Sequence, residues 1–255
     1  MSTTIPEPEL QQQFDRDGYV AFPQYLDHGE MTELVANVDR FIGDVLPRLP
    51  AEHVFYEDRD DATTLKQIQQ LGQYDAWFHQ LLTVGRFPDL AQRLLDGPVV
   101  PRNMQYFNKP PAVGQPTPAH QDGYYFMLDP CEAVTMWLAL EDVDQETGCV
   151  RYVQSSHKQG MREHARTGTL GFSQGIVDYP TDSDRLNEVA FPAGPGDLLV
   201  HHAMTIHRAD GNRSATRSRR ALGLIYYSER AQEDAEAHAA YQQGLAADMK
   251  SANQI

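Results

Sequence analysis

The 255-residue chain has little cysteine and no long apolar run. Cys131 and Cys149 are its only cysteines, too few for a disulfide framework or a thiolate zinc site. Residues 1–6 lack the basic and apolar regions of a secretory signal, and no stretch approaches the roughly 20 apolar residues that cross a bilayer. These absences predict a cytoplasmic protein that does not span a membrane.

Basic residues are scarce as well. The chain has 21 Lys and Arg against 36 Asp and Glu, which gives a formal net charge of -15. This charge repels phosphate backbones and anionic lipid surfaces, so nucleic acids and membranes are disfavoured as partners. A small-molecule substrate is favoured instead, and the composition leaves the oligomeric state open.

The periodicity of the chain changes twice along its length. With 41% hydrophobic residues the chain can bury one substantial core, and we expect a single domain over 1–255. A mainly helical part over about 6–95 precedes a β-rich core over about 99–228 and a C-terminal helix over about 229–249. Short strands are typical of an antiparallel barrel or sandwich, and they are predicted near 99–107, 119–127, 133–140, 148–153, 187–191, 197–202 and 219–228.

Two further segments have a local signature. Asp27, followed three residues later by Glu30, is typical of a capping box, and apolar residues continue at helical spacing to Leu49. Gly18–Phe22 is predicted to be a short strand before this helix. The stretch 157–186 has weak periodicity and is predicted to be a long loop, of the kind that often forms a lid or binding segment.

A His-Gln-Asp triplet carries the main chemical signal. On the predicted strand, alternate residues share a face, so His120 and Asp122 would project to one side and Gln121 to the other. An apolar strand that returns along the sheet would bring His207 beside them. Two histidines and one carboxylate that leave the other metal positions open form the ligand set of ferrous oxygenases. The competing candidates for the third ligand are His201 and His202.

Arg219 follows His207 at the start of the last predicted strand. A permanently charged, forked guanidinium suits bidentate binding of a carboxylate. Alternation places Ala221 and Gly223 on the same face, which would leave space for a bound cosubstrate, and turns Arg220 outward. We therefore predict that Arg219 binds a carboxylate. Surface exposure is predicted for Arg208, Arg213, Arg217 and Arg220.

From about Leu10 to Tyr227 the sequence resembles the phytanoyl-CoA dioxygenase family of Fe(II)- and 2-oxoglutarate-dependent oxygenases. The resemblance depends on the order and spacing of several motifs together. It implies a mainly β fold with flanking helices: a double-stranded β-helix, or cupin-like jelly-roll. The motifs are Phe14–Val20, Asn108–Pro111, His120–Asp122, Trp137–Asp142, Thr147–Cys149, Ser156–Lys158, Gly196–Asp197, Ile206–His207 and Arg219–Ala221.

The same resemblance implies a role for individual residues. His120, Asp122 and His207 would bind Fe(II), and Arg219 would hold the distal carboxylate of 2-oxoglutarate. The reaction would consume dioxygen and 2-oxoglutarate, hydroxylate an unactivated carbon of a small-molecule metabolite, and release succinate and CO2. The remaining cosubstrate contacts would be Lys66, Gln105 and Trp137.

Two positions depart from the family pattern. Ala209 stands where many members have serine, so one hydrogen bond to the cosubstrate, worth about 1 kcal/mol, is absent or supplied elsewhere. Gln154-Ser155 replaces a frequent Pro-Gly pair, and only a local change of turn is expected. Asp122 follows the hydroxylases, since related iron halogenases have a small residue there.

Two other functions are compatible with part of the pattern. A catalytically silent relative would bind metal or 2-oxoglutarate as a sensor or scaffold, although the intact triad and Arg219 argue against it. A non-oxidative, cupin-type zinc enzyme would have no use for Arg219, Lys66 or Gln105. Dioxygen-dependent conversion of 2-oxoglutarate to succinate separates these possibilities.

Overall fold

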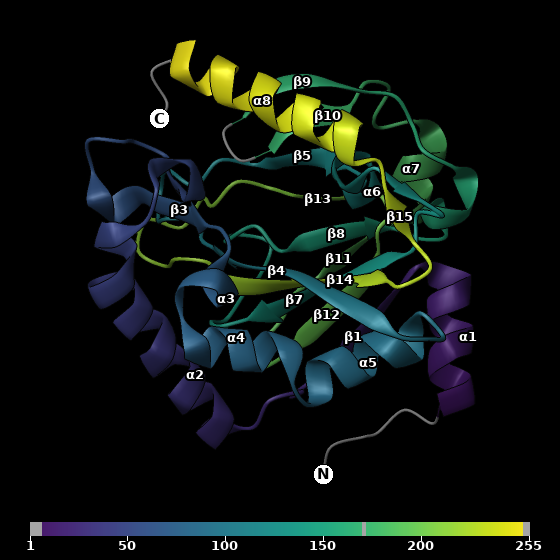
Figure 1. Cartoon of the computed structure of the whole chain (residues 1–255), viewed down its shortest axis with the longest axis horizontal. Helices are drawn as coiled ribbons and strands as arrows, with labels where there is room; N and C mark the ends of the chain where they lie inside the picture. The colour runs from purple at the N-terminus through teal and green to yellow at the C-terminus, as the bar shows by residue number, and fades with distance from the viewer. Residues whose placement is uncertain (1–6, 170–171, 252–255) are drawn as a thin grey trace.

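The computed structural model describes residues 7–169 and 172–251. Within this part of the chain, two antiparallel sheets form a jelly-roll (Figure 1). The larger sheet has the order β1-β12-β7-β14-β4-β3-β2, formed by β1 (Tyr19–Phe22), β12 (Leu198–His202), β7 (Ala133–Ala139), β14 (Ala221–Ser228), β4 (Val99–Phe107), β3 (Leu65–Ile68) and β2 (Val54–Tyr56). The smaller sheet has the order β11-β8-β13-β5, formed by β11 (Glu188–Phe191), β8 (Val150–Val153), β13 (His207–Ala209) and β5 (Thr117–His120).

The residues of strand β7 show that both faces of the larger sheet are covered. Its residues alternate between two apolar clusters, as expected for a strand whose successive side chains point to opposite sides. Met136 and Leu138 pack into the cluster that includes the helical residues Leu34 and Phe78. Trp137 packs between the sheets with residues of the smaller sheet. Helices therefore cover one face of this sheet, and the second sheet covers the other.

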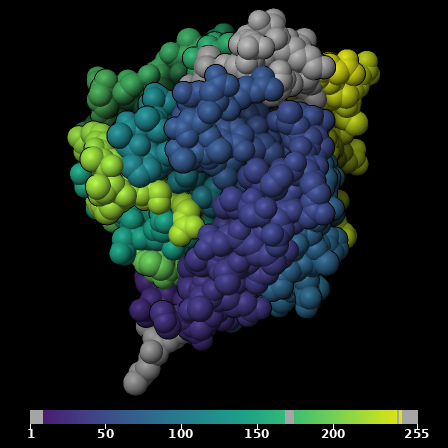
Figure 2. All heavy atoms as spheres, turned by 90° about the vertical axis from the view of Figure 1, so that its left-hand side faces the viewer, coloured from purple at the N-terminus to yellow at the C-terminus, as the bar shows by residue number. Residues whose placement is uncertain are grey.

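The N-terminal helices lie along the outer face of the larger sheet (Figure 1). In the view of Figure 1 the last helix, in yellow, is drawn in front of β9 (His164–Thr169) and β10 (Phe172–Ile176). Figure 2 shows the N-terminal part of the chain, purple to blue, spread over one side of the molecule. The helices are α1 (Glu7–Asp17), α2 (His28–Arg40), α3 (Leu71–Tyr74), α4 (Ala76–Thr83), α5 (Arg86–Leu94), α6 (Asp122–Phe126), α7 (Asp182–Asn187) and α8 (Ala235–Ser251).

The capping box at the start of α2 is confirmed. The Asp27 carboxylate accepts a hydrogen bond from the Glu30 backbone N–H, and the Glu30 carboxylate accepts one from the Asp27 backbone. Leu34 and Val38 are buried, and the helix continues into a π-helical turn over Phe41–Val45. The strand predicted over Gly18–Phe22 is β1, and the strand predicted near 99–107 is β4.

The prediction of a loop over 157–186 is wrong. This segment contains a 3-10 turn (Ser156–Gln159), the hairpin strands β9 (His164–Thr169) and β10 (Phe172–Ile176), and α7. The Thr181 hydroxyl caps α7 by accepting from the Asp184 N–H. The hairpin packs against β5, where a Cβ on Gly175 of β10 would lie 3.2 Å from Pro118. This packing does not depend on alternating apolar residues, so the hairpin has no clear periodic signal in the sequence.

Two other boundaries differ from the predicted ones. The helical N-terminal part also contains strands β2 and β3, which extend the larger sheet beside β4. The C-terminal helix begins at Ala235, because residues 232–233 first form β15 (Gln232–Glu233), which pairs with β6 (Leu128–Asp129). Both short strands are stabilised by pairing with a distant segment, and such pairing leaves no periodic signal in their own sequence.

Candidate functional site

Three side chains distant in sequence meet at one end of the smaller sheet. His207 on β13 pairs in register with His120 on β5, and Asp122 follows two residues later. The Asp122 Oδ1 lies 3.4 Å from His120 Nε2 and 3.6 Å from His207 Nε2. One ligand atom from each residue lies within 4.8 Å of the other two, so this group could hold a metal ion.

Asp122 reaches this position from a helix and not from a strand, so the strand predicted over 119–127 is wrong beyond His120. β5 ends at His120, and Asp122 begins the short helix α6. The turn is fixed by Gly123, whose N–H donates to the Ala203 carbonyl. A Cβ on Gly123 would lie 2.4 Å from Cys131 Sγ, so a larger residue would not fit without a shift.

The Nδ1 atoms of the two histidines each contact a backbone carbonyl. His120 Nδ1 lies 2.8 Å from the Pro118 carbonyl oxygen, and His207 Nδ1 lies 3.0 Å from that of Thr205. A carbonyl can only accept, so each Nδ1 donates a hydrogen bond to it. In the neutral imidazole Nε2 is then the ring nitrogen that can bind a metal, and both Nε2 atoms face Asp122 Oδ1.

The charges of the group suit a cation. Burial alone would raise the pKa of the Asp122 carboxyl, but the imidazoles of His207, His120 and His201 hold this pKa well below its usual range. Burial, together with repulsion from His120 and His201, lowers the pKa of His207 well below its usual value. The lowered pKa keeps the Asp122 carboxyl ionised, which is the form that binds a metal ion.

The other candidates for the third ligand have different partners. His201 Nε2 lies 3.2 Å from Asp122 Oδ2, the second carboxylate oxygen, and its Nδ1 lies 3.0 Å from the Tyr152 hydroxyl. Both of its ring nitrogens are thus engaged. The His202 ring lies beside Phe14, and its Nδ1 accepts the backbone N–H of Met204.

Arg219 is a buried cation. Its side chain is 4% exposed, its Nε has no hydrogen-bond partner, and among the described residues no carboxylate pairs with it. Burial lowers its pKa to about 10. Its guanidinium carbon lies 5.4 Å from the centre of the Trp137 ring, which is a cation–π contact. A buried charge without an anionic partner is costly, so this position favours an anionic ligand.

The space expected beside Gly223 is filled. The Phe107 ring lies 2.6 Å from the position that a Cβ on Gly223 would take. The glycine therefore makes room for this ring, and the prediction that Ala221 and Gly223 leave space for a cosubstrate is wrong at Gly223.

Two of the arginines predicted to be exposed, Arg208 and Arg220, lie instead in partly buried ion pairs, whereas Arg217 lies in an exposed one. Arg220 pairs with Glu141 and Asp39, which distinguishes it from the neighbouring Arg219. Arg213 is exposed, as predicted. The other pairs are Arg208 with Glu188 and Asp210, and Arg217 with Asp144 and Glu146.

Lys66 and Gln105 belong to two adjacent strands near this arginine. Lys66 on β3 is 6% exposed, and its Nζ lies 3.2 Å from the Glu57 carboxylate. The Gln105 Oε1 accepts a hydrogen bond of 2.6 Å from Gln67. Lys109, for which no role was predicted, is also buried, and burial together with the charges of Arg219 and Lys66 lowers its pKa well below the usual range. Its place in the Asn-Lys-Pro-Pro motif is the sequence signal that could have drawn attention to it.

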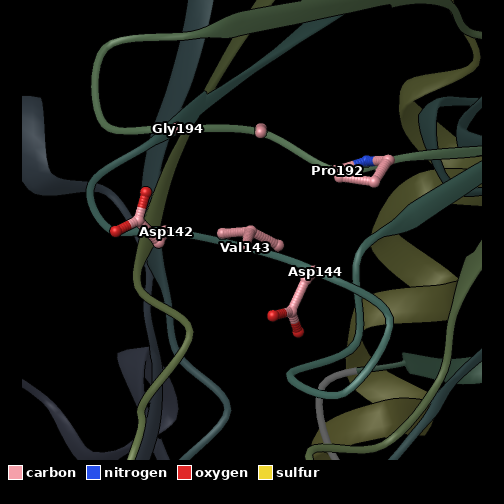
Figure 3. A pocket seen from close by; sticks show the side chains of 6 residues that line it. Asp142, Val143, Asp144, Pro192 and Gly194 are labelled. Carbon is pink, nitrogen blue, oxygen red and sulfur yellow. The ribbon is translucent and has the colours of Figure 1, made fainter.

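A surface hollow with a volume of about 350 Å³ lies elsewhere, bounded by two turns that follow β7 and β11 (Figure 3). None of the residues predicted to bind the metal or the cosubstrate lines it. The lining residues are Asp142, Val143, Asp144, Pro192, Ala193 and Gly194.

A jelly-roll that brings two imidazoles and a carboxylate together, with a buried arginine between the sheets, defines a class of metal-dependent oxygenases. Residues 14–221 match the family model "Phytanoyl-CoA dioxygenase (PhyH)". The chain therefore belongs to this family of non-haem iron, 2-oxoglutarate-dependent oxygenases.

Curated relatives agree with this assignment. The chain is 29% identical over 201 residues to phytanoyl-CoA dioxygenase domain-containing protein 1 of Danio rerio, which covers 74% of this chain and 68% of the relative. It is 30% identical over 183 residues to a phytanoyl-CoA dioxygenase of Arabidopsis thaliana, covering 67% of this chain and 63% of the relative. It is 25% identical over 232 residues to a methylphosphonate hydroxylase of Gimesia maris, with coverages of 89% and 82%.

Solved structures share the fold. The carbocyclase SnoK from nogalamycin biosynthesis superposes with a TM-score of 0.72 at 24% identity, covering 94% of this chain and 92% of its own. The epimerase SnoN, in complex with Fe3+, alpha ketoglutarate and nogalamycin RO, superposes with a TM-score of 0.71 at 24% identity, with coverages of 89% and 85%. In the described part of this chain, no helix is both long and apolar enough to cross a membrane.

Proposed function

We propose that this protein is an Fe(II)- and 2-oxoglutarate-dependent dioxygenase that hydroxylates an unactivated carbon of a small-molecule metabolite and releases succinate and CO2. One observation carries the proposal: a His-Asp-His group that could hold a metal ion lies in the same jelly-roll as a buried arginine that has no carboxylate partner among the described residues. The first favours a cation and the second an anion. A 2-oxoglutarate ion bound to Fe(II) supplies both.

The donor set fits iron. His120 and His207 would each offer Nε2, and Asp122 would offer Oδ1, which leaves the remaining metal positions open. When bound, Fe(II) supplies the activation of dioxygen that drives oxidative decarboxylation of 2-oxoglutarate. The protein residues hold and orient the reactants, and a nitrogen and oxygen ligand set with one carboxylate suits Fe(II) better than a closed structural zinc site.

The cation between the sheets fits the distal carboxylate of 2-oxoglutarate. The Arg219 fork would donate two parallel hydrogen bonds, and Trp137 would support it from one side. We propose that Lys66 and Gln105 complete the cosubstrate site. Their partners Glu57 and Gln67 hold these side chains in place, so little side-chain entropy would be lost on binding.

Aromatic residues border the proposed metal site on the side of α6. The Tyr125 ring meets the His120 ring edge-on with centres 5.7 Å apart, and the Tyr241 ring of α8 lies 6.1 Å from Tyr125. The Tyr125 hydroxyl is already bonded to the Gln174 backbone. We propose that this aromatic wall contacts a substrate with a compact apolar part, in keeping with the methylphosphonate hydroxylase among the relatives.

The test is succinate formation by Fe(II)-loaded protein, with and without dioxygen. We expect dioxygen-dependent turnover that is lost in Asp122→Ala and in His207→Ala. A silent sensor would bind 2-oxoglutarate without converting it, and a zinc enzyme would not need dioxygen. Retained turnover in both variants would refute the ligand assignment.

The product then defines the reaction. Similar folds include a carbocyclase and an epimerase, so oxidation of 2-oxoglutarate alone does not establish hydroxylation. Incubation with a metabolite library should yield a product that gains one oxygen atom. A product of unchanged mass would indicate epimerisation, and the loss of two hydrogens would indicate ring closure. Either result would contradict the proposed hydroxylation.

A further inference from the structure

The Asp122 carboxylate lies between two cross-strand pairs, one from each sheet. The smaller sheet presents His120 and His207, which are partners in register and face Oδ1. The larger sheet presents Thr135 on β7 and His201 on β12, which are also partners in register. The Thr135 hydroxyl donates to Oδ2 at 2.5 Å, and His201 Nε2 lies 3.2 Å from the same oxygen.

We propose that Thr135 and His201 are positioning residues that hold Oδ2 of Asp122, so that this carboxylate offers the metal only Oδ1. This inference rests on the proposed function, because it concerns the same metal site. A carboxylate that binds through one oxygen takes one metal position, whereas one that binds through both takes two. Holding Oδ2 therefore preserves an open position for a reactant.

The Tyr152 hydroxyl contacts the other ring nitrogen of His201. A carboxylate only accepts hydrogen bonds, so His201 Nε2 carries a proton when it contacts Oδ2. In the neutral imidazole, Nδ1 then accepts from the Tyr152 hydroxyl, 3.0 Å away. Tyr152 is fully buried and His201 is 3% exposed. The hydroxyl thus sets the tautomer of His201, which in turn aims its donor at Asp122.

Of the four groups around the Asp122 carboxylate, two face Oδ1 and the other two face Oδ2. Lone pairs on His120 and His207 face Oδ1, where a cation would replace the weak contacts of 3.4 and 3.6 Å. O–H and N–H donors face Oδ2. A carboxylate oxygen has two lone pairs, and the Thr135 hydroxyl and the His201 N–H occupy both of them on Oδ2, so this oxygen is closed to the metal. The geometry itself selects which oxygen binds.

The experiment measures metal binding and not turnover. Co(II), which resists oxidation in air, is titrated into the chelator-treated full chain without 2-oxoglutarate, and its dissociation constant and visible absorption spectrum are recorded. We expect the double variant Thr135→Val/His201→Leu to lose roughly 10- to 100-fold in Co(II) affinity, the range typical when groups behind a ligand are removed. X-ray absorption at the cobalt edge should show a shorter distance to the carboxylate carbon, as two-oxygen binding requires.

Conservative variants separate positioning from general damage to the sheet. Thr135→Ser keeps the hydroxyl and His201→Gln keeps a donor near the Nε2 position, so both should retain affinity and spectrum close to those of the wild type. Thr135→Val is nearly isosteric and should fold even if the double variant does not. His202→Leu removes the neighbouring imidazole, which is bonded away from the site, and should leave the cobalt spectrum unchanged.

The outcomes distinguish this inference from the proposed function. Wild-type affinity and spectrum in both Thr135→Val and the double variant would overturn the positioning role, while loss of Co(II) binding in Asp122→Ala would still support the ligand set. If Asp122→Ala and His207→Ala bind Co(II) as tightly as the wild type, the metal site itself is wrong. Equal losses in Thr135→Ser and Thr135→Val would also overturn the inference, because the hydroxyl would then be irrelevant.

Discussion

Replacing Arg219 with methionine should stabilise the protein without ligand and abolish its response to 2-oxoglutarate. The guanidinium is 4% exposed and lacks a carboxylate partner among the described residues. Methionine has a similar length, carries no charge and adapts to irregular space. The substitution therefore removes the energetic cost of burying a charge, and it also removes a group that would bind 2-oxoglutarate. The first effect raises the free energy of unfolding without ligand, and the second lowers the stabilisation that the ligand provides.

The size of the first effect follows from the pKa of this arginine. Lowering a pKa from 12.5 to about 10 corresponds to a cost of about 3 kcal/mol for keeping the Arg219 charge in the folded protein. Because the folded pKa is the lower one, this cost is complete at pH 7 and declines only as the pH rises from about 10 toward 12.5. The variant should gain roughly 1–3 kcal/mol in free energy of unfolding, since replacing buried charges by apolar groups often stabilises to this extent.

The second effect is the loss of a charged hydrogen-bond pair. Each hydrogen bond to a charged group contributes about 1.5–3 kcal/mol, so losing two should weaken 2-oxoglutarate binding by roughly 100-fold or more. Urea unfolding of Co(II)-loaded protein, with and without 2-oxoglutarate, measures both effects. At a concentration of about 100 times its dissociation constant, the ligand should stabilise the wild type by about 2.7 kcal/mol and the variant hardly at all.

Arg220→Met is the matched control. This neighbour pairs with Glu141 and Asp39 and is 25% exposed, so its loss should cost up to about 1 kcal/mol and leave the response to 2-oxoglutarate intact. The reasoning fails if Arg219→Met is less stable than the wild type without ligand, or if 2-oxoglutarate stabilises both proteins equally.

Three further predictions concern the metal, the pH and the β9–β10 hairpin. Chelation should abolish succinate formation, Fe(II) should restore it and Zn(II) should not; restoration by Zn(II) would favour a non-oxidative enzyme. Burial, and to a smaller extent repulsion from His157 and His201, lowers the pKa of His202 from 6.5 to about 4. The folded state therefore binds fewer protons than the unfolded state between these values, so the free energy of unfolding should fall as the pH drops from 6.5 to about 4. Unfolding midpoints measured across this range should fall less in His202→Asn. Gln121→Leu should speed amide hydrogen exchange over 160–164, because the buried amide of Gln121 bonds to the backbones of Gly160, Arg162 and Met204; unchanged exchange would show that these bonds do not hold the segment.

The sequence predicts the residues of the site better than it predicts the helix and strands that position them. His120, His207 and Arg219 could be identified because residue type and motif order limit their roles. The reason given for Asp122 was wrong, since α6 and not strand alternation directs its carboxylate. A turn held by a hydrogen bond from the Gly123 N–H to the distant Ala203 carbonyl has no local signature. Most β-strands of the core were predictable from apolar runs, but β13 was not among the predicted strands, and the β9–β10 hairpin depends on packing against β5.

The role of Thr135 and His201 could not be predicted from the sequence for a related reason. They act together only because β7 and β12 pair in one register, and a shift of either strand by one residue would turn its side chain to the opposite face. Spacing along the chain does not contain that register. His201 therefore competed with His207 as the predicted third ligand, although its two ring nitrogens contact Asp122 and Tyr152.

Unpartnered buried polar atoms give an independent indication of where a ligand belongs. In the described residues, four such side-chain atoms occur. Three of them lie in β3, just after β4 and just before β14: Gln67 Oε1, Asn108 Oδ1 and Arg219 Nε. The backbone links them, since Asn108 N–H donates to the Lys66 carbonyl and Lys109 exchanges backbone hydrogen bonds with Arg219. Buried polar groups are normally paired, and well-packed cores rarely leave three such atoms in one region. A fold that is consistent elsewhere departs from this rule mainly at functional sites, so the unpaired atoms favour a polar occupant in this region. Arg219 Nε would donate to an anionic group of that occupant, whereas the two amide oxygens would accept from its donors.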